Sequence, residues 1–354
     1  MTNIVTIKDE TIIFDPEIYG NWYYHGVFYG RGIELKHGEG RGNIYLTCEY
    51  YKELDEHFPI FESTDGGKTF SHISDIYNTE FTRKKYKNES WKMLYQPTFC
   101  ELSKDLGQLK KGTVLCVGTT VANSHCAIVI YYSTDNLRTW NYLSTVAEGG
   151  RCNMEIGSAI WEGFLVLDKG ILYCFYSDER GMNKGGQRIV VKTSTDGKNW
   201  SEDIKVCDFE EENPKYRPGM PIVTKMPDER FLLTYEGVNM GSPHPGFYKI
   251  TDDIAKWDCK DHGVLMPSVF GGGSPYCATM PDGKVIIGSH GTKKIGVNED
   301  CVKTNEWQLF DTCVEIGYTR CLCPLSNGDL MIISGGSWNA KGARKLKIAI
   351  KRFV

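Results

Sequence analysis

Ser63-Thr-Asp65-Gly-Gly-Lys-Thr-Phe70 is the stretch that decides the fold, because copies of it recur along the 354-residue chain. The copies are Ser133-Thr-Asp135-Asn-Leu-Arg-Thr-Trp140, Ser194-Thr-Asp196-Gly-Lys-Asn-Trp200 and a weaker one, Thr251-Asp252-Asp-Ile-Ala-Lys-Trp257. In each copy, Ser or Thr and Asp side chains can bind backbone N–H groups of a tight turn, Gly or Asn tolerates a positive φ, and the aromatic ring packs the turn onto its sheet. Repetition every ~60 residues predicts a propeller or a solenoid.

The repeated phrase resembles the Asp-box of the sialidase-like β-propellers. That resemblance implies a structural turn between the third and fourth strands of a blade rather than a ligand contact. The composition agrees with an all-β fold, since aromatic residues make up 12% of the chain and 38 residues are Gly. Strands are rich in aromatic residues, and turns are rich in glycine.

The sequence contains a second repeat, a hairpin pattern that consists of an apolar strand, a tight turn and another apolar strand. The second strands are residues 42–48, 112–117, 170–175, 229–234, 283–288 and 328–333. Six hairpins predict a single six-bladed β-propeller domain over residues 1–354. The run 345–351 is left as the third strand of the sixth blade, and we expect residues 4–13 to supply its fourth strand, closing the ring and hiding an edge.

Charge and cysteine content narrow the partners and the compartment. The net charge of −4 and pI near 6.1 favour neither nucleic acid nor an anionic membrane, and no apolar run approaches the ~20 residues of a membrane span. Several of the 13 cysteines lie in apolar strand patterns and are read as small buried hydrophobes. This usage fits a reducing compartment, and no signal peptide is recognised in this chain. No spacing typical of metal ligands occurs, so we expect no metal or other cofactor, and we expect a monomer.

Counting back from each hairpin turn aligns one residue of each innermost strand. Eight residues before the turn, with allowance for two longer turns, lie Arg31, Gln96, Glu162, Pro221, Pro275 and Arg320. Innermost strands border the central channel of a propeller, so we expect these positions to ring one mouth of that channel. Arginine, glutamine and glutamate in such a ring favour a binding site over packing alone.

Counting forward seven residues from each turn gives the ends of the second strands on the same face. These positions are Glu49, Thr119, Ser177, Glu236, His290 and Gly335. Glu236 of the fourth blade and Glu162 of the third therefore converge on one mouth. Two facing carboxyl groups are the minimal equipment for cleaving a glycosidic bond, and Trp161 and Tyr235 can shield them or stack on a sugar. Ion pairing of both carboxylates with channel arginines is the alternative, and the spacing leaves the two open.

A set of short motifs resembles the core of glycoside hydrolase family 93, in the same order and with similar spacing. The motifs are Trp161-Glu-Gly-Phe164, Tyr176-Ser-Asp178, Gly186-Gln187, Arg217-Pro-Gly-Met-Pro221 and Leu233-Thr-Tyr-Glu236, with Tyr29-Gly-Arg31 and Gly317-Tyr-Thr-Arg320 towards the two ends. The resemblance covers most of the chain. It implies a six-bladed exo-α-1,5-L-arabinanase that acts on arabinan with retention of configuration and releases arabinobiose, a family whose members are secreted.

By the same resemblance, Glu162 corresponds to the nucleophile, Glu236 to the acid/base, and Tyr318 to a tyrosine of the site. One departure is Gly163, which stands where the family pattern has proline and is expected to loosen the mouth of the strand. The further residues expected to contact substrate are Arg31, Gln96, Trp161, Asp178, Arg217, His290 and Arg320. For Arg217 and Asp178 a structural role weighs as much as substrate contact. For Tyr23 and Tyr24 we favour packing between blades over a sugar platform.

Two rival functions remain open. A sialidase would use Tyr318 as nucleophile and an arginine triad, for which Arg31, Arg217 and Arg320 are available. Against it, the first blade reads Tyr29-Gly-Arg-Gly-Ile33 and lacks the Phe/Tyr-Arg-Ile-Pro motif of that class. The rival from another class is a non-catalytic glycan-binding propeller.

Overall fold

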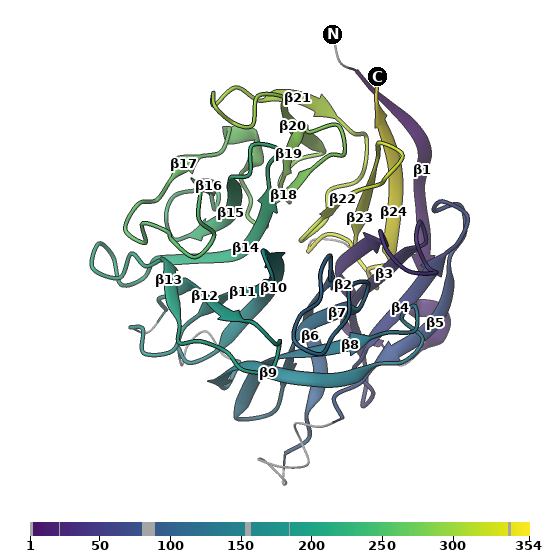
Figure 1. Cartoon of the computed structure of the whole chain (residues 1–354), viewed down its shortest axis with the longest axis horizontal. Helices are drawn as coiled ribbons and strands as arrows, with labels where there is room; N and C mark the ends of the chain where they lie inside the picture. The colour runs from purple at the N-terminus through teal and green to yellow at the C-terminus, as the bar shows by residue number, and fades with distance from the viewer. Residues whose placement is uncertain (1–2, 21, 80–88, 153–156, 184, 339–340) are drawn as a thin grey trace.

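Six four-stranded antiparallel sheets surround a central axis in the computed structural model, which describes residues 3–20, 22–79, 89–152, 157–183, 185–338 and 341–354 (Figure 1). Blade 1 is β2 (Trp22–Glu34), β3 (Ile44–Lys52), β4 (Phe58–Ser63) and β5 (Ser71–Ile76). Blade 2 is β6 (Lys92–Glu101), β7 (Val114–Val121), β8 (His125–Ser133) and β9 (Asn141–Gly150). Blade 3 is β10 (Ile160–Asp168), β11 (Ile171–Asp178), β12 (Arg188–Ser194) and β13 (Ile204–Cys207).

The remaining three blades follow in chain order around the ring. Blade 4 is β14 (Arg217–Lys225), β15 (Phe231–Val238), β16 (Gly246–Thr251) and β17 (Val264–Leu265). Blade 5 is β18 (Tyr276–Thr279), β19 (Val285–Gly288), β20 (Lys294–Asn298) and β21 (Gln308–Asp311). Blade 6 is β22 (Cys321–Pro324), β23 (Asp329–Ser334), β24 (Leu346–Phe353) and β1 (Ile4–Phe14). The only helices in the described residues are α1 (Pro16–Tyr19) and a 3₁₀ turn, Ser268–Phe270, and neither is long and apolar enough to cross a membrane.

The six-bladed propeller and its closure by the N-terminal strand are therefore confirmed. β1 pairs antiparallel with β24 from Ile4 opposite Phe353 to Phe14 opposite Leu346. The first and last strands of the described chain thus share one sheet, seen side by side at the right of Figure 1. This pairing covers the edge of β24, which would otherwise be open to association with another strand.

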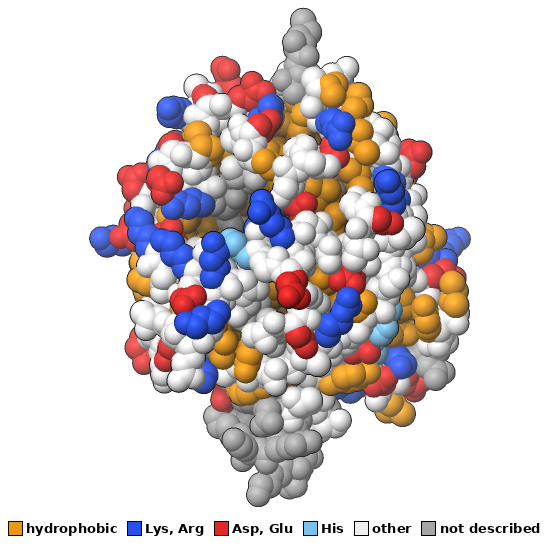
Figure 2. Space-filling view, turned by 45° about the vertical axis from the view of Figure 1, so that its right-hand side comes forward, with side chains coloured by type: hydrophobic (Ala, Val, Ile, Leu, Met, Phe, Trp, Pro, Cys, Tyr) orange, Lys and Arg blue, Asp and Glu red, His pale blue; other side chains and the backbone are white. Residues whose placement is uncertain are grey.

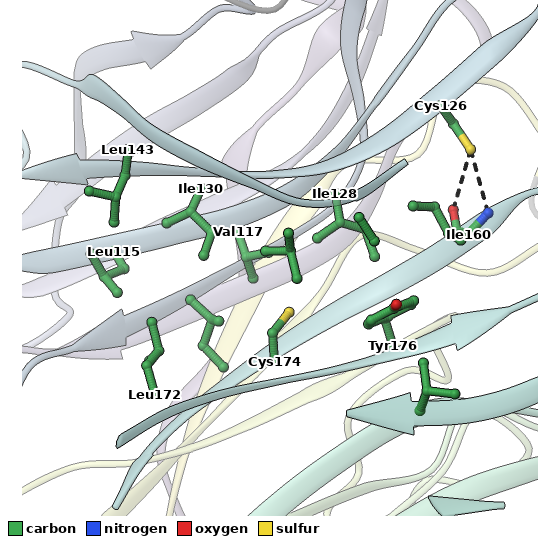
Figure 3. Close-up of a cluster of buried hydrophobic side chains, with 14 of the residues drawn as sticks. Leu115, Val117, Cys126, Ile128, Ile130, Leu143, Ile160, Leu172, Cys174 and Tyr176 are labelled. Carbon is green, nitrogen blue, oxygen red and sulfur yellow. Dashed lines mark hydrogen bonds between the residues drawn. The ribbon is translucent and has the colours of Figure 1, made fainter. Parts of the chain in front are cut away.

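The blades are held together by apolar clusters, one at each of the six interfaces between neighbouring blades. Figure 3 shows the cluster between blades 2 and 3, where Val117 and Ile128 lie against Cys174 and Tyr176. Cysteines predicted to be small buried hydrophobes, such as Cys48, Cys116, Cys174 and Cys277, lie in these clusters. On the face drawn in Figure 2, positive and negative side chains are interspersed.

The repeated Ser-x-Asp turns join the third and fourth strands of their blades, as expected. In blade 1, the Ser63 hydroxyl accepts the N–H of Gly67 at 2.8 Å, and Asp65 accepts the N–H groups of Lys68 and Thr69 at 2.9 and 3.0 Å. In the weaker copy of blade 4, Asp253 rather than Asp252 accepts a turn N–H, that of Ala255. Sequence reading missed a further copy in blade 5, where Asn298 replaces the serine and accepts the N–H of Val302.

Candidate active site

A residue with left-handed backbone geometry interrupts the innermost part of every blade, and this feature builds the site. These residues are Tyr29, Gln96, Glu162, Met220, Ser274 and Thr319, with φ between 48° and 66°. In β2, β6, β10 and β14 the pairing register shifts at this residue, as in a β-bulge. A bulge leaves its residue outside the ladder of hydrogen bonds, so the N–H group can point to a partner in the adjacent blade.

Carboxyl or amide oxygens from the preceding blade accept four of these N–H groups. Gln96 N donates to Glu49 Oε1 at 2.8 Å, and Glu162 N donates to Gln96 Oε1 at 3.0 Å. Met220 N donates to Glu162 Oε2 at 2.6 Å, and Ser274 N donates to Glu236 Oε2 at 2.8 Å. Three acidic side chains are thus fixed around one end of the channel, each by the backbone of its neighbouring blade.

These acids line one pocket of about 610 Å³ at the mouth of the channel. Its other lining residues are Tyr23, Tyr24, Phe28, Tyr29, Tyr51, Leu94, Tyr95, Gln96, Cys152, Trp161, Gln187, Arg217, Val238, Tyr318 and Trp338. Six of the ten residues predicted from sequence are therefore gathered here: Gln96, Trp161, Glu162, Arg217, Glu236 and Tyr318. The volume is in the range of pockets that enclose small ligands.

Glu162 is held by two hydrogen bonds, both to the same oxygen. Ser177 Oγ donates to Glu162 Oε2 at 2.6 Å, beside the bond from Met220 N. Oε1 of Glu162 accepts no hydrogen bond from the described residues. A side chain at position 219 would interfere, because a Cβ there would lie 2.6 Å from Gln187 Nε2 and 3.4 Å from Glu162 Oε2. Gly219 therefore provides the space that the Gln187 amide occupies, whereas Glu162 Oε2 lies at an ordinary contact distance from this position.

Burial raises the pKa of all three acids. It raises the pKa of Glu162 to about 7, together with the charge of Glu236 and against the hydrogen bonds from Ser177 and Met220. It raises the pKa of Glu236 as well, against the hydrogen bond from Ser274. The pKa of Glu49 rises to about 8 for the same reason, against hydrogen bonds from Gln96 and Tyr51. Hydrogen bonds to an ionised carboxylate favour ionisation, and Glu162 accepts two of them whereas Glu236 accepts one.

Aromatic rings form one side of the pocket because four blades carry an aromatic residue just before the left-handed one. These residues are Phe28, Tyr95, Trp161 and Tyr318, which we call the aromatic wall; blades 4 and 5 have Gly219 and Gly273 instead. Tyr24 and Trp338, 59% and 39% exposed, continue it to the rim. Tyr23 and Tyr24 thus face the pocket, in contrast to the packing role that we favoured from sequence.

Trp161 and Arg217 are anchored by one acid that sequence reading missed, Glu179. Its Oε1 accepts Trp161 Nε1 at 3.1 Å and Arg217 Nη2 at 2.7 Å, and its side chain is fully buried. Arg217 also donates to Gln187 Oε1 at 2.8 Å. Arg217 lines the pocket while serving in this ion pair, so both roles considered for it fit its position.

Arg31 and Arg320 are not in the pocket, contrary to prediction. The count from the hairpin turns assumed regular strands, but Tyr29 and Tyr318, not Arg31 and Arg320, line the pocket, and the left-handed residues of these blades are Tyr29 and Thr319. Arg31 lies deeper in the channel, donates to the backbone oxygens of Gly30 and Thr319, and has its guanidinium 4.7 Å from the centre of the Tyr29 ring. Arg320 is 2% exposed and donates to Lys294 O at 3.1 Å.

Asp178 and His290 also lie outside the pocket lining. Asp178 is fully buried and forms ion pairs with Arg180 at 2.7 Å and Arg188 at 3.0 Å, because strand alternation turns Ser177, and not Asp178, towards Glu162. The centre of the His290 ring lies 5.9 Å from that of the Tyr318 ring. Burial lowers the pKa of His290.

Gly163 lies in the irregular part of β10, where the pairing register shifts between Trp161 and Phe164. A Cβ at this position would lie 2.8 Å from Val117 Cγ2 and 3.0 Å from Ile128 Cγ2, so blade 2 packs closely over the glycine. The left-handed residues of blades 2, 4 and 5 are followed by Pro97, Pro221 and Pro275, whereas in blade 3 the corresponding space is taken by valine and isoleucine methyl groups of blade 2.

Several solved structures align with this chain over nearly its whole length. A GH93 α-L-arabinofuranosidase of Fusarium graminearum, in complex with arabinobiose, has 30% identity and a TM-score of 0.85, with 98% of this chain and 97% of that chain covered. An α-L-arabinanase of Penicillium chrysogenum, also complexed with arabinobiose, has 27% identity, a TM-score of 0.85 and 98% of each chain covered. A protein of unknown function from Dyadobacter fermentans, with 13% identity and a TM-score of 0.64 over 99% of this chain and 100% of that one, shares the fold. No family model and no curated protein matches the sequence.

Proposed function

The chain belongs to glycoside hydrolase family 93, and from that premise we propose that it is an exo-acting α-1,5-L-arabinanase that releases arabinobiose with retained configuration. The observation that carries the proposal is the pair Glu162 and Glu236, fixed by Met220 N and Ser274 N in one pocket. The Fusarium graminearum and Penicillium chrysogenum structures both contain arabinobiose, which supports an arabinan substrate.

Glu162 is the nucleophile in this proposal. Its two hydrogen bonds both reach Oε2, so Oε1 is free to attack the anomeric carbon and form a covalent glycosyl-enzyme. The donors Ser177 and Met220 favour its ionised form, as attack requires. They also fix the rotation of the carboxylate, so the attacking oxygen is positioned before substrate arrives.

Glu236 is the acid/base. Its Oε2 is held by Ser274 N, and Oε1 is left to protonate the leaving oxygen and then to deprotonate the water that releases the sugar. Burial beside a second carboxyl group keeps a proton on the pair at a pH where an exposed glutamate has lost it.

Tyr318 supports the pair without acting as the nucleophile. Burial, with the charges of Glu236 and Glu162, raises the pKa of Tyr318 well above its usual value. The phenol therefore keeps its proton and can donate it as a hydrogen bond in the pocket. The sialidase alternative needs a tyrosine nucleophile and three converging arginines, yet Arg31 and Arg320 lie outside this pocket.

Product analysis on linear α-1,5-arabinan tests the proposal. We expect arabinobiose as the first and main product, with the anomeric configuration retained by NMR at early times. A ladder of longer products would indicate endo cleavage, arabinose alone would indicate release of single sugars, and hydrolysis of a sialoside but not of arabinan would favour the sialidase. Binding of arabino-oligosaccharides without hydrolysis would favour the binding module.

A further inference from the structure

Glu49 is a third carboxyl group in the pocket, and a two-carboxyl mechanism does not use it. It lies near the end of β3, is 2% exposed, and lines the pocket together with Glu162 and Glu236. Gln96 N donates to its Oε1 at 2.8 Å, and Tyr51 OH donates to its Oε2 at 2.9 Å. No lysine or arginine of the described residues forms an ion pair with it within 4.0 Å. A buried acid without a salt bridge is costly to the fold.

The position of Glu49 is equivalent to that of Glu236. Each follows its hairpin turn by seven residues, Glu49 on β3 and Glu236 on β15, and each accepts the left-handed N–H of the next blade. Blades 1 and 4 are opposite one another in a ring of six (Figure 1). Glu49 therefore enters the pocket from the side opposite Glu236, whereas Glu162, on blade 3, is adjacent to Glu236.

The surroundings of Glu49 are those of a sugar-binding surface. Tyr51, Tyr95 and Phe28, from the same side of the ring, line the pocket beside it. Aromatic faces with a few fixed polar groups are the usual lining of a small-ligand site. Each Glu49 oxygen already accepts one hydrogen bond and has a further lone pair. Because burial raises its pKa to about 8, this carboxyl keeps its proton near neutral pH and can also donate.

We propose that Glu49 binds a hydroxyl group of the sugar at the chain end, on the side of the pocket away from the bond that is cleaved. The inference rests on the proposed function, since it assigns Glu49 to the glycone side of the same substrate. It makes Glu49 a specificity residue that helps to select a free chain end, with no part in breaking the bond.

The test compares Glu49→Gln and Glu49→Asp with the wild-type protein on arabinotriose. We expect KM to rise about 10–100-fold in both variants, with kcat within a few-fold of wild type, because one hydrogen bond to substrate is lost in ground and transition states alike. Affinity for arabinobiose, measured calorimetrically in a Glu162→Gln background, should fall by a similar factor. Glu34→Gln is the matched control: Glu34 is a buried acid of blade 1 at the other end of β2, bonded to Ser326, and its loss should leave KM unchanged.

Three results would overturn the inference. The first is unchanged KM and arabinobiose affinity in both variants. The second is loss of kcat with unchanged arabinobiose affinity, which would make Glu49 a positioning residue acting through Gln96 on Glu162. The third is restoration of turnover by azide, which would give Glu49 an acid/base role. If the wild-type protein neither cleaves arabinotriose nor binds arabinobiose, the proposed function fails and this inference with it; wild-type cleavage with unaffected variants contradicts the inference alone.

Discussion

The Glu236 carboxylate occupies the space that a side chain at Gly273 would take: a Cβ there would lie 2.5 Å from Glu236 Oε2. The same oxygen accepts the N–H of Ser274, the residue that follows this glycine. The position of the acid therefore depends on the missing side chain as much as on the hydrogen bond.

Gly273→Ala is expected to reduce kcat/KM on arabinan at least 100-fold by displacing Glu236. The backbone adds strain, since φ is +81° at this position. Gly170→Ala is the matched control, because its φ of +83° imposes similar strain while a Cβ there meets nothing within 4 Å. Steady-state kinetics of both variants test this prediction. An equal loss of kcat/KM in the two would show that backbone strain alone is responsible, and wild-type activity in Gly273→Ala would contradict the displacement of Glu236.

Azide should distinguish the two catalytic glutamates. In Glu236→Ala the anion can attack the glycosyl-enzyme without a general base, so turnover of a substrate with a good leaving group should recover and give a glycosyl azide of retained configuration. In Glu162→Ala the anion can only fill the vacated space and give the inverted product. NMR of the azide products reads out the configuration; exchanged outcomes would exchange the roles.

Glu162→Gln is expected to stabilise the protein above neutral pH. The pKa of Glu162 rises from 4.5 to about 7 on folding, so between these values the folded state holds more protons than the unfolded state. Stability from this group is therefore lost as pH rises through that window, and removing the charge should restore about 1–2 kcal/mol at pH 8 and little at pH 4.

Asp65→Asn gives the opposite sign and serves as the comparison. Hydrogen bonds from Thr69, Ser63 and Lys68 hold the pKa of Asp65 well below its usual value. This carboxylate stabilises the fold above pH 3.8, and its contribution disappears as the solution becomes more acidic. Urea unfolding of both variants across pH 3–8 tests the pair, and parallel curves for wild type and Glu162→Gln would refute the first expectation.

Glu179 and Arg217 should behave as one unit. Replacing either by Ala leaves its buried partner uncompensated, which typically costs about 3–5 kcal/mol. The double replacement by Ala should cost less than the sum of the two single replacements, because no charge is left behind. Activity should stay low in the double variant, since Trp161 loses its acceptor. The free energies of unfolding of the single and double variants give the coupling energy between Glu179 and Arg217. Strictly additive costs would contradict the expectation that the two act as one unit.

Gly163→Ala should destabilise the interface between blades 2 and 3 by about 1–3 kcal/mol, because its methyl group meets Val117 and Ile128. Val117→Ala in the same chain should relieve part of the cost. Thermal unfolding of the single and double variants measures this, and an additive double variant would place the strain elsewhere.

The ring and its closure could be predicted because each hairpin leaves a local pattern of apolar strand, turn and apolar strand. The count back from the hairpin turns, with its allowance for the longer turn of blade 2, placed Gln96 and Glu162 at the mouth of the channel, where both line the pocket. Arg320 was misplaced by one residue, because sequence does not show which residue at the mouth of a blade takes the left-handed conformation. Glu179 was missed because its partners Trp161 and Arg217 come from other strands. The aromatic residue just before the left-handed one in four of the blades was the available signal for the pocket wall.

The N–H groups of the left-handed residues are a repeated feature of the backbone, whereas the side chains that accept them differ from blade to blade. Each blade presents one such residue, and what differs from blade to blade is which acceptor, if any, its neighbour supplies: Glu49, Gln96, Glu162 and Glu236 serve blades 2 to 5. Reactive groups can thus be added, exchanged or moved around the ring one side chain at a time, while the apolar clusters that hold the blades together stay untouched. Such a scaffold is suited to acquiring new substrates by small evolutionary or engineered steps.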